Sequence, residues 1–192
     1  MIRRRWAKSK IFLLIIGLCA VFLIALIVRS GVIAAVSSKD TSQIKYETYS
    51  YKDVPLTVSL PASTDVTEDY YSSGEIIINS QLRDDVHNYH GYLQIWRISD
   101  PEEFIKKSKL NSAYHFTAYE QNKITQGNYQ GFVISWSAQL QDSGYISGRD
   151  YILQNKDDEE EFLRISLTTK EKVFPEELGK IADTIVSSVV WK

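Results

Sequence analysis

The sequence predicts an α+β fold: a mainly antiparallel β-sheet flanked by two helices and preceded by an N-terminal transmembrane helix. Three observations support this prediction. One charge-free apolar run lies near the start, at residues 11–28. Short segments rich in Tyr, Ile, Val, Phe and Thr follow, separated by Gly, Asn, Asp and Ser, which is the composition of strands joined by turns. Two helix-start signals, at Asp100 and Phe174, interrupt these segments, and this order of elements is typical of an α+β domain.

The transmembrane helix is the first predicted element. The 18 residues 11–28 carry no charge, and at ~1.5 Å per residue they span roughly 27 Å, close to the hydrocarbon thickness of a bilayer. Five basic residues precede them, so the positive-inside rule places residues 1–10 in the cytoplasm and the domain outside it. We therefore expect a single-pass protein of the cell membrane. A cleaved signal peptide stays open as the alternative, because residues 32–34, Val-Ile-Ala, resemble a cleavage site.

The remainder divides into a polar stalk at residues 29–43 and one domain at residues 44–192, which is a common domain size. Beyond the apolar run, 17 Lys and Arg stand against 24 Asp and Glu, a formal charge near −7. A surface of this sign repels phosphate backbones, so nucleic acid is not an expected partner. The only cysteine, Cys19, lies within the apolar run, so no disulfide is expected in the domain.

Seven or eight strands are expected, with ends defined to within ~2–4 residues. In the sixth of them Phe132, Ile134 and Trp136 alternate with smaller or polar residues, which predicts one buried and one wetter face. The expected strands are residues 44–51, 56–60, 75–79, 91–99, 115–124, 130–139, 145–154 and 161–169.

Two helices are expected among these strands. Asp100 offers an N-cap acceptor, Pro101 suits the first turn, and two glutamates follow at the positive end of the helix dipole, so a helix should run to about Leu110. The second helix begins near Phe174, and its apolar residues recur at helical spacing, which predicts an apolar stripe that packs across a sheet. That stripe consists of Leu178, Ile181, Ala182, Ile185 and Val189.

The outline from about residue 46 to residue 191 resembles the PsbP-like fold. Residues 55–61, Pro-Leu-Thr-Val-Ser-Leu-Pro, resemble the opening strand of that family, which runs into a proline. Residues 181–189 resemble its closing helix, with the Ile-Val-x-Ser ending at residues 185–188. The resemblance implies an antiparallel sheet flanked by helices. It also implies a non-catalytic domain that assists a larger complex or binds a partner.

Catalytic motifs are missing from the sequence, which has no Gly-x-Ser-x-Gly, no His-Glu-x-x-His and no phosphate loop. We therefore expect a non-enzymatic accessory or binding domain that acts through an unknown protein or cell-envelope partner. A metal-dependent or serine hydrolase stays open as the alternative, because three histidines and many serines allow a Ser-His-Asp arrangement built from distant parts of the chain.

One segment concentrates ligand-type side chains. Asp84, Asp85, His87 and His90 lie within seven residues, and carboxylates and imidazoles are ligands of divalent metals such as zinc, with His115 as a possible third imidazole. The alternative is an ordinary turn between two strands, where Asp, Asn and His are common. Apart from this possible metal, no cofactor is expected.

Tyr89, Tyr92 and Trp96 are the candidate ligand-binding or partner-binding residues. They lie beside the Asp/His segment on a predicted strand whose two faces both carry apolar groups. Exposed rings stack on carbohydrate or peptide, whereas buried rings supply the bulk of a small core. The sequence leaves both roles open, and the discriminating feature is whether these rings line a concave site.

Overall fold

The computed structural model describes residues 44–71, 74–98, 100–141, 144–155 and 158–191. The chain divides into a unit at residues 1–44 and a second, compact unit at residues 45–192, which contains every described strand and helix. The helices are α2 (Pro101–Leu110) and α3 (Glu176–Ser187). The strands are β1 (Tyr46–Ser50), β2 (Leu56–Pro61), β3 (Asp65–Tyr70), β4 (Ile76–Asp84), β5 (Tyr89–Arg97), β6 (His115–Gln126), β7 (Tyr129–Gln139), β8 (Tyr145–Asn155), β9 (Asp158–Thr169) and β10 (Val190–Trp191).

The expected fold class requires a correction. Among the residues that the structure describes, no helix is both long and apolar enough to cross a membrane. Helices α2 and α3 have 10 and 12 residues, and at ~1.5 Å per residue each reaches only about half of the hydrocarbon thickness. The N-terminal transmembrane helix expected at residues 11–28, with residues 1–10 and the stalk at 29–43, lies outside the described residues. The fold class is therefore a mainly antiparallel β-sheet domain with two helices.

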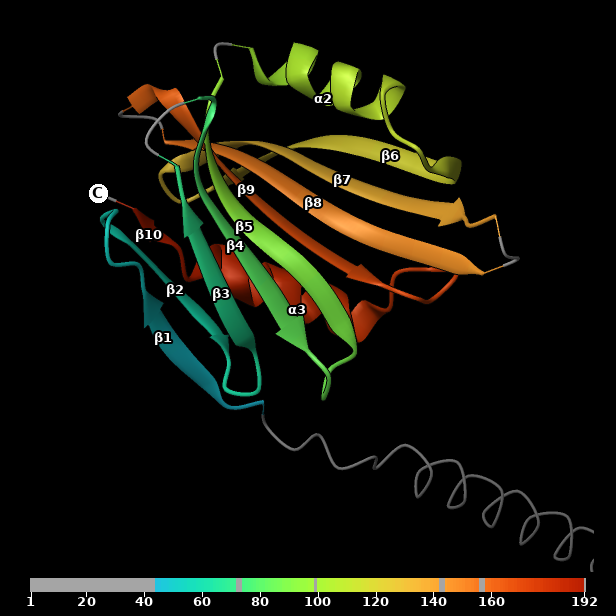
Figure 1. Cartoon of the computed structure of the whole chain (residues 1–192), viewed down its shortest axis with the longest axis horizontal. Helices are drawn as coiled ribbons and strands as arrows, with labels where there is room; N and C mark the ends of the chain where they lie inside the picture. Colours follow the sequence, from blue (N-terminus) through green and yellow to red (C-terminus); the bar gives the residue numbers. More distant parts are fainter. Residues whose placement is uncertain (1–43, 72–73, 99, 142–143, 156–157, 192) are drawn as a thin grey trace, which may run out of the picture. The chain divides into compact units, whose positions relative to one another are not determined.

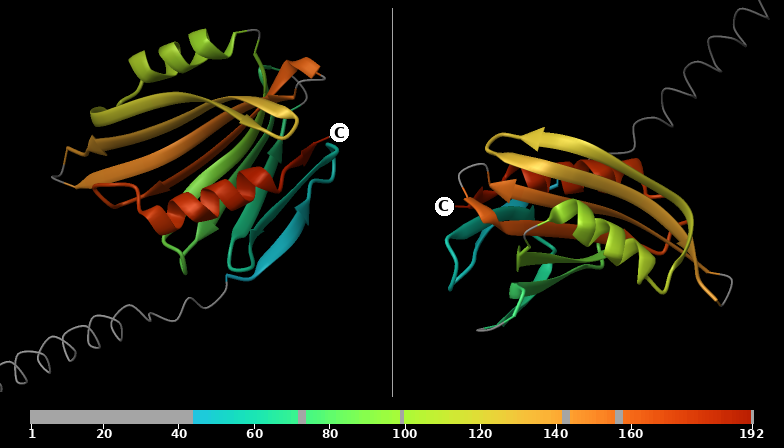
Figure 2. Two further views of the ribbon diagram at one scale, coloured as in Figure 1. Left: turned by 180° about the vertical axis from the view of Figure 1, so that it is seen from behind. Right: turned by 90° about the horizontal axis from the view of Figure 1, so that it is seen from above.

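Seven strands form the main sheet in the order β3-β4-β5-β9-β8-β7-β6, and every neighbouring pair is antiparallel. A second, small sheet has the order β1-β2-β10. Helix α2 covers one face of the main sheet, and α3 lies on the opposite face beside the small sheet (Figures 1 and 2). The domain thus has a central sheet with a helix on each side, which gives it two separate apolar interfaces.

Strand number and strand ends differ from the expectation. The structure has ten strands among the described residues. The two that were not expected are β3 and the two-residue β10. Strand β3 has the sequence Asp-Val-Thr-Glu-Asp-Tyr, and half of its residues are acidic, which is unfavourable for a strand and disguises it. Strand β4 continues to Asp84 rather than ending near Asn79, so Asp84 belongs to a strand and not to a loop.

Helix α3 packs its apolar stripe against the sheets as predicted. Ile181 and Ile185 are 2% and 0% exposed, and Leu178, Ala182 and Val186 are buried with them. Leu93 of β5 and Ile165 of β9, which are paired across the sheet, are also completely buried. The predicted burial of Ile181 and Ile185 is confirmed.

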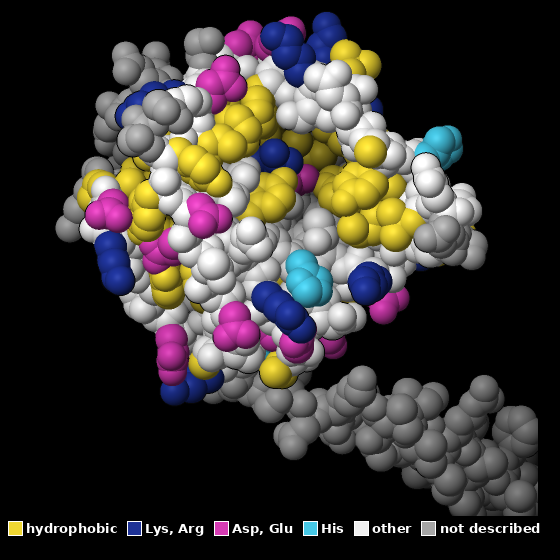
Figure 3. Space-filling view, viewed as in Figure 1, with side chains coloured by type: hydrophobic (Ala, Val, Ile, Leu, Met, Phe, Trp, Pro, Cys, Tyr) yellow, Lys and Arg dark blue, Asp and Glu magenta, His cyan; other side chains and the backbone are white. Residues whose placement is uncertain are grey.

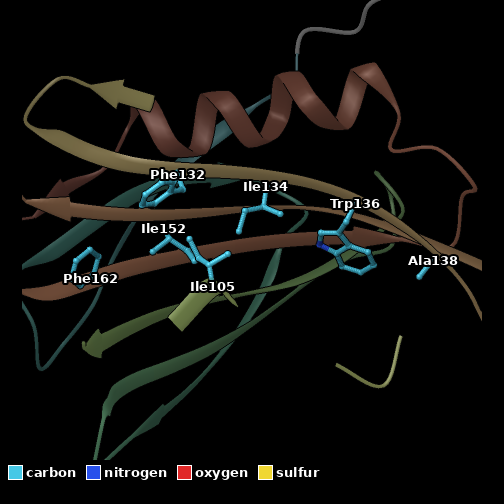
Figure 4. Close-up of a cluster of buried hydrophobic side chains, with 7 residues drawn as sticks. All are labelled: Ile105, Phe132, Ile134, Trp136, Ala138, Ile152 and Phe162. Atoms are coloured by element: carbon cyan, nitrogen blue, oxygen red, sulfur yellow. The ribbon is translucent and has the colours of Figure 1, made fainter. Parts of the chain in front are cut away.

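A second apolar cluster lies on the α2 face of the main sheet (Figure 4). The alternation predicted for the segment 130–139 is confirmed, because Phe132, Ile134, Trp136 and Ala138 of β7 are buried on this face. The cluster is completed by Ile105 of α2, Ile152 of β8 and Phe162 of β9. It anchors α2 to the sheet and forms one wall of the cavity described next.

Candidate functional site

A cavity of about 310 Å³ lies between α2 and the main sheet. On this side the molecule is hollowed, and hydrophobic side chains ring the hollow, with basic and acidic side chains inside it (Figure 3). Residues of α2, of the segment after it and of strands β5 to β9 line the cavity, among them Tyr92, Phe104, Ser108, Lys109, Ser112, Tyr114, Phe116, Tyr119, Ile134, Trp136, Asp150, Ile152, Arg164, Ser166 and Thr168. We call this cavity the α2 pocket.

The sheet register brings the floor of the α2 pocket together. Asp150 of β8 is paired with Ile134 of β7 on one side and with Ser166 of β9 on the other. Side chains alternate between the two faces of a strand, so Trp136 and Arg164, each two positions from one of these partners, share the face of Asp150. Helix α2 contributes residues 104, 105, 108 and 109, which lie at helical spacing, and Ser112 follows in the segment after the helix.

Asp150 is the central polar group of the floor, and it is 6% exposed. The indole Nε1 of Trp136 donates a hydrogen bond to its Oδ2 at 2.7 Å. Its Oδ1 lies 3.3 Å from Nη2 of Arg164 and 3.5 Å from the hydroxyl of Tyr92. Burial raises the pKa of the Tyr92 phenol, and the charge of Asp150 raises it further, so Tyr92 stays a protonated donor. Both carboxylate oxygens of Asp150 are therefore engaged by the protein.

Arg164 carries more hydrogen-bond donors than the protein satisfies. Its guanidinium lies over the rings of Tyr92 and Phe104, at 4.9 and 5.8 Å from their centroids. Within the described residues its buried Nε has no hydrogen-bond partner, and its one ion pair is with Asp150. A guanidinium has five N–H donors. The buried Nε cannot be reached from the pocket, but the side chain of Arg164 is 21% exposed and lines the pocket, so the accessible N–H groups at the end of its guanidinium can donate to a molecule that enters.

Aromatic rings form one wall of the α2 pocket. The ring of Tyr114 stacks on that of Trp136, with centroids 5.3 Å apart and planes inclined by 24°. Phe116 meets Trp136 and Tyr119 edge-on, at 5.8 and 5.2 Å. Tyr114 is 41% exposed, so this wall extends from the buried floor to the surface. A flat apolar group that enters the pocket can therefore make stacked or edge-to-face contacts with these rings.

Because Gly148 has no side chain, the indole of Trp136 can pack directly against its backbone. The two residues are paired across β7 and β8. A Cβ atom at Gly148 would lie 2.6 Å from Cζ2 of the indole and 3.1 Å from the carbonyl oxygen of Leu167. Any larger residue would push the indole away from Asp150. Gly148 therefore fixes the position of a pocket wall.

The three aromatic residues predicted as a binding site lie on two faces of β5. Tyr92 lines the α2 pocket. Trp96 is on the same face and packs against Phe104 of α2, with ring centroids 5.0 Å apart, so it supports the helix. Tyr89 is completely buried on the opposite face, where its hydroxyl lies 2.6 Å from Oγ1 of Thr64. The structure brings Tyr92 and Trp96 together and separates Tyr89 from them.

Asp84 closes the turn between β4 and β5. Its carboxylate is completely buried and accepts hydrogen bonds from the backbone N–H groups of Val86 and His87, both at 2.9 Å. It also accepts from Oγ of Ser63 and lies 2.8 Å from Nδ1 of His87. Burial alone would raise the pKa of Asp84, but the hydrogen bonds from His87 and Ser63 lower it below its ordinary value. The geometry gives Asp84 a structural role in this turn.

The other candidate metal ligands point to different partners. Asp85 forms a two-fold hydrogen-bonded ion pair with Arg83, at 3.0 and 2.8 Å. His90 is exposed on β5 and lines a separate, shallow hollow with Asp65 and Arg83. Within the described ranges, no group of three or more His, Cys, Asp or Glu side chains is arranged to hold a metal ion. A metal role for Asp84, Asp85, His87 and His90 stays a prediction.

Two further hollows, of about 520 and 680 Å³, are larger than the α2 pocket. The first is lined by residues of the edge strand β6 with β7, β8 and α3, and the second by residues of the edge strand β3 with β4 and β5. The lining of both is mainly polar, and neither contains more than one aromatic ring. Volume alone does not identify a binding site, since a ligand pocket combines apolar walls with a few placed polar groups. The α2 pocket fits that description best.

The residues of the α2 pocket other than Tyr92 were not predicted as a site. A signal was present in the strand patterns, because Asp150 lies two positions before Ile152 and therefore shares its face of the strand. Arg164 gave no such signal, because it alternates with the apolar residues Leu163 and Ile165. Tyr114 lies in the short segment between α2 and β6 and carried no periodic signal.

No protein-family model matches the chain, and no curated protein matches it by sequence. The structure is similar to the solution structure of cyanobacterial PsbP (CyanoP) from Synechocystis sp. PCC 6803, with a TM-score of 0.52 and 11% sequence identity. The match covers 80% of this chain and 96% of the cyanobacterial one. At this identity the likeness concerns the fold alone, and it agrees with the resemblance seen in residues 55–61 and 181–189. The domain has a PsbP-like fold.

Proposed function

We propose that the domain is a non-enzymatic accessory domain that binds a partner protein through the α2 pocket. The observation that carries the proposal is the pocket itself: aromatic walls around a buried polar floor, open to the surface at an exposed ring. Tyr114 lines the pocket and is 41% exposed, and large apolar side chains at the opening of a pocket are typical of sites that receive an anchor residue of a partner. The PsbP-like fold is compatible with such a role.

A serine hydrolase is the rival function, and Ser63, Asp84 and His87 are its best candidates. In a catalytic triad the histidine accepts from serine with one ring nitrogen and donates to aspartate with the other. Here the same atom, Nδ1 of His87, lies 3.2 Å from Oγ of Ser63 and 2.8 Å from Oδ2 of Asp84. The Ser63 hydroxyl donates directly to Asp84 at 2.8 Å. This geometry favours a turn held together by hydrogen bonds over a nucleophile activated by a base.

Chemistry in the α2 pocket is also disfavoured. Its serines, Ser108, Ser112 and Ser166, have no histidine among the lining residues, which all belong to the described part of the chain. A serine nucleophile needs an adjacent base, and both oxygens of Asp150 are already engaged. The pocket is therefore better suited to binding than to hydrolysis.

The proposal includes a location at the cell membrane, with the domain outside the cytoplasm. Its support is the charge asymmetry of the sequence, in which five basic residues precede residues 11–28. Protease added to intact spheroplasts should digest the domain under this proposal. A domain that stays intact until the cells are lysed would refute the location.

Site-directed photocrosslinking in cells tests partner binding. A photoreactive amino acid is introduced into the full-length chain at position 114, at the mouth of the pocket. The matched control carries it at position 173, where Val173 is 72% exposed in the segment before α3. We expect one discrete adduct with a single protein from position 114 and none from position 173. Equal adducts from both positions, or none from position 114, would contradict the proposal.

A further inference from the structure

The geometry points to a specific ligand chemistry for the α2 pocket: an aromatic residue that carries a carboxylate, presented as the C-terminal residue of the partner polypeptide. This inference rests on the proposed function and adds the chemical group that the pocket recognises. Three features carry it, namely the charge of the lining, the accessible donors of Arg164, and the arrangement of rings between the floor and the surface.

The lining has an excess of positive charge, although the domain as a whole is acidic. Its charged residues are Lys109, Arg164 and Asp150. The carboxylate of Asp150 is engaged by Trp136 and Arg164. The ammonium of Lys109 lies 3.9 Å from the ring centroid of Tyr119, and among the described residues no carboxylate lies within ion-pair distance of it. One positive charge in the pocket is therefore uncompensated.

A carboxylate is the group that best complements the positive charge and the N–H donors of the pocket. The guanidinium carbon of Arg164 lies over the rings of Tyr92 and Phe104, and the N–H donors of a guanidinium point outward in its own plane. A carboxylate accepts two parallel hydrogen bonds from the edge of a guanidinium, and charge-assisted bonds of this kind are roughly twice as strong as neutral ones.

The aromatic wall of the α2 pocket indicates that the ligand also carries an aromatic ring. Tyr114, Phe116 and Trp136 lie between the floor and the surface at centroid distances of 5.3 to 6.3 Å from one another. Aromatic pairs at such separations prefer edge-to-face or offset stacking. A ring joined to a carboxylate by a short chain can contact this wall while its carboxylate reaches the edge of Arg164.

A polypeptide end fits the site better than a free small molecule does. The apolar surface of the pocket continues to the outside through Tyr114, which lines the pocket and is 41% exposed. A small ligand would leave this exposed surface in water, whereas residues that precede a C-terminal ring would cover it. The occupant is therefore the end of a chain.

The test is an amide NMR titration of the full-length protein with two matched probes. N-acetyl-phenylalanine carries the ring and a C-terminal carboxylate, and N-acetyl-phenylalanine amide lacks only the charge. The acid should shift signals of residues that line the α2 pocket and should bind at least about tenfold more tightly than the amide, since tenfold corresponds to the ~1.4 kcal/mol of one charge-assisted hydrogen bond. Acetate alone, without a ring, should leave these signals in place.

Single-residue variants test whether Lys109 and Arg164 recognise the carboxylate of the acid probe. Lys109→Gln removes an exposed charge without touching the core and should weaken binding of the acid but not of the amide. Lys106→Gln, on the exposed side of the same helix, is the matched control and should change neither. Arg164→Gln should abolish the preference for the acid, and Lys109→Gln keeps the test informative if Arg164→Gln does not fold.

Equal binding of the acid and the amide would overturn recognition of a carboxylate, and so would an acid whose affinity is unchanged by Lys109→Gln. Binding of acetate as tight as that of the acid would overturn the role of the ring. A partner adduct at position 114 would still support the accessory function in each of these cases, so failure of the ligand chemistry and failure of the proposed function are distinguishable.

Discussion

Trp136 and Asp150, on neighbouring strands, are joined by a hydrogen bond of 2.7 Å from the indole Nε1 to Oδ2. The two side chains are 8% and 6% exposed. An aspartate at such a depth needs donors for both oxygens, because an unsatisfied buried charge is costly. The bond therefore connects the aromatic wall of the α2 pocket to its polar floor, so that the position of one depends on the other.

Trp136→Phe tests this connection. Phenylalanine keeps much of the apolar volume but has no N–H, so Oδ2 of Asp150 loses its donor. The free energy of unfolding should fall by ~1–3 kcal/mol, the usual cost of leaving a buried acceptor unsatisfied. Denaturant titration measures it. An unchanged stability would mean that water replaces the indole and that the floor is more open than the structure indicates.

Gly148→Ala should displace the indole of Trp136, because the added methyl group would lie 2.6 Å from Cζ2 of the indole. Overpacking of this kind typically costs ~1–3 kcal/mol. Gly144→Ala is the matched control, since its Cβ would meet only Leu140 at 3.7 Å, an ordinary contact. Thermal unfolding of the two variants compares them. Equal stabilities would show that the β7–β8 pair accommodates the methyl group without moving the indole.

Asp84→Asn tests the turn between β4 and β5 through its pH dependence. The pKa of Asp84 is lower in the folded protein than its ordinary value of 3.8. Its charged form therefore stabilises the fold at pH values above 3.8, and this contribution is lost as the pH falls through the lower folded pKa. The variant should be less stable than the wild type at pH 7 by ~1–3 kcal/mol, and the difference should shrink toward pH 2.

The control for this prediction is Asp85→Asn, whose side chain is 69% exposed. Its free energy of unfolding at pH 7 should change by less than ~0.5 kcal/mol, as is usual for surface substitutions. The measurement is a series of urea titrations between pH 2 and pH 7. A difference between Asp84→Asn and the wild type that stays constant with pH would contradict the assigned role of the Asp84 carboxylate.

Ile185→Ala tests the packing of α3. Ile185 is completely buried, and truncation of a buried isoleucine costs ~2–5 kcal/mol. Val173→Ala, at a side chain that is 72% exposed, should change the stability by less than ~0.5 kcal/mol. Urea titration gives both values. A small effect at position 185 would show that α3 does not pack on the sheets as described.

The fold could be predicted from the sequence where local signals and burial agree. Helix α2 has the expected start, with Oδ1 of Asp100 accepting a hydrogen bond from the backbone N–H of Glu103 at 2.9 Å, and it ends at Leu110 as predicted. The alternation in residues 130–139 gave the correct buried face. Strand β3 was missed because its acidic residues hide its pairing with β4, which only the folded sheet supplies.

The site could be predicted only in part. Tyr92 was identified, but Tyr89, three positions earlier, points to the opposite face of β5, because side chains alternate along a strand and β5 begins at Tyr89 rather than at Gly91 as expected. Asp150 and Arg164 are 14 residues apart and meet only because β8 and β9 are adjacent. Such contacts follow from strand order, which a single sequence does not reveal.

Partner binding at the α2 pocket can be measured directly. The decisive measurement is the affinity of the protein crosslinked at position 114, once purified, for the wild type and for Tyr114→Ser. Tyr114 is 41% exposed, so its removal should leave the fold intact, as thermal unfolding will check. We predict that binding weakens at least about tenfold, a loss of ~1.4 kcal/mol. An affinity equal to that of the wild type would contradict the assignment of the pocket as the binding site.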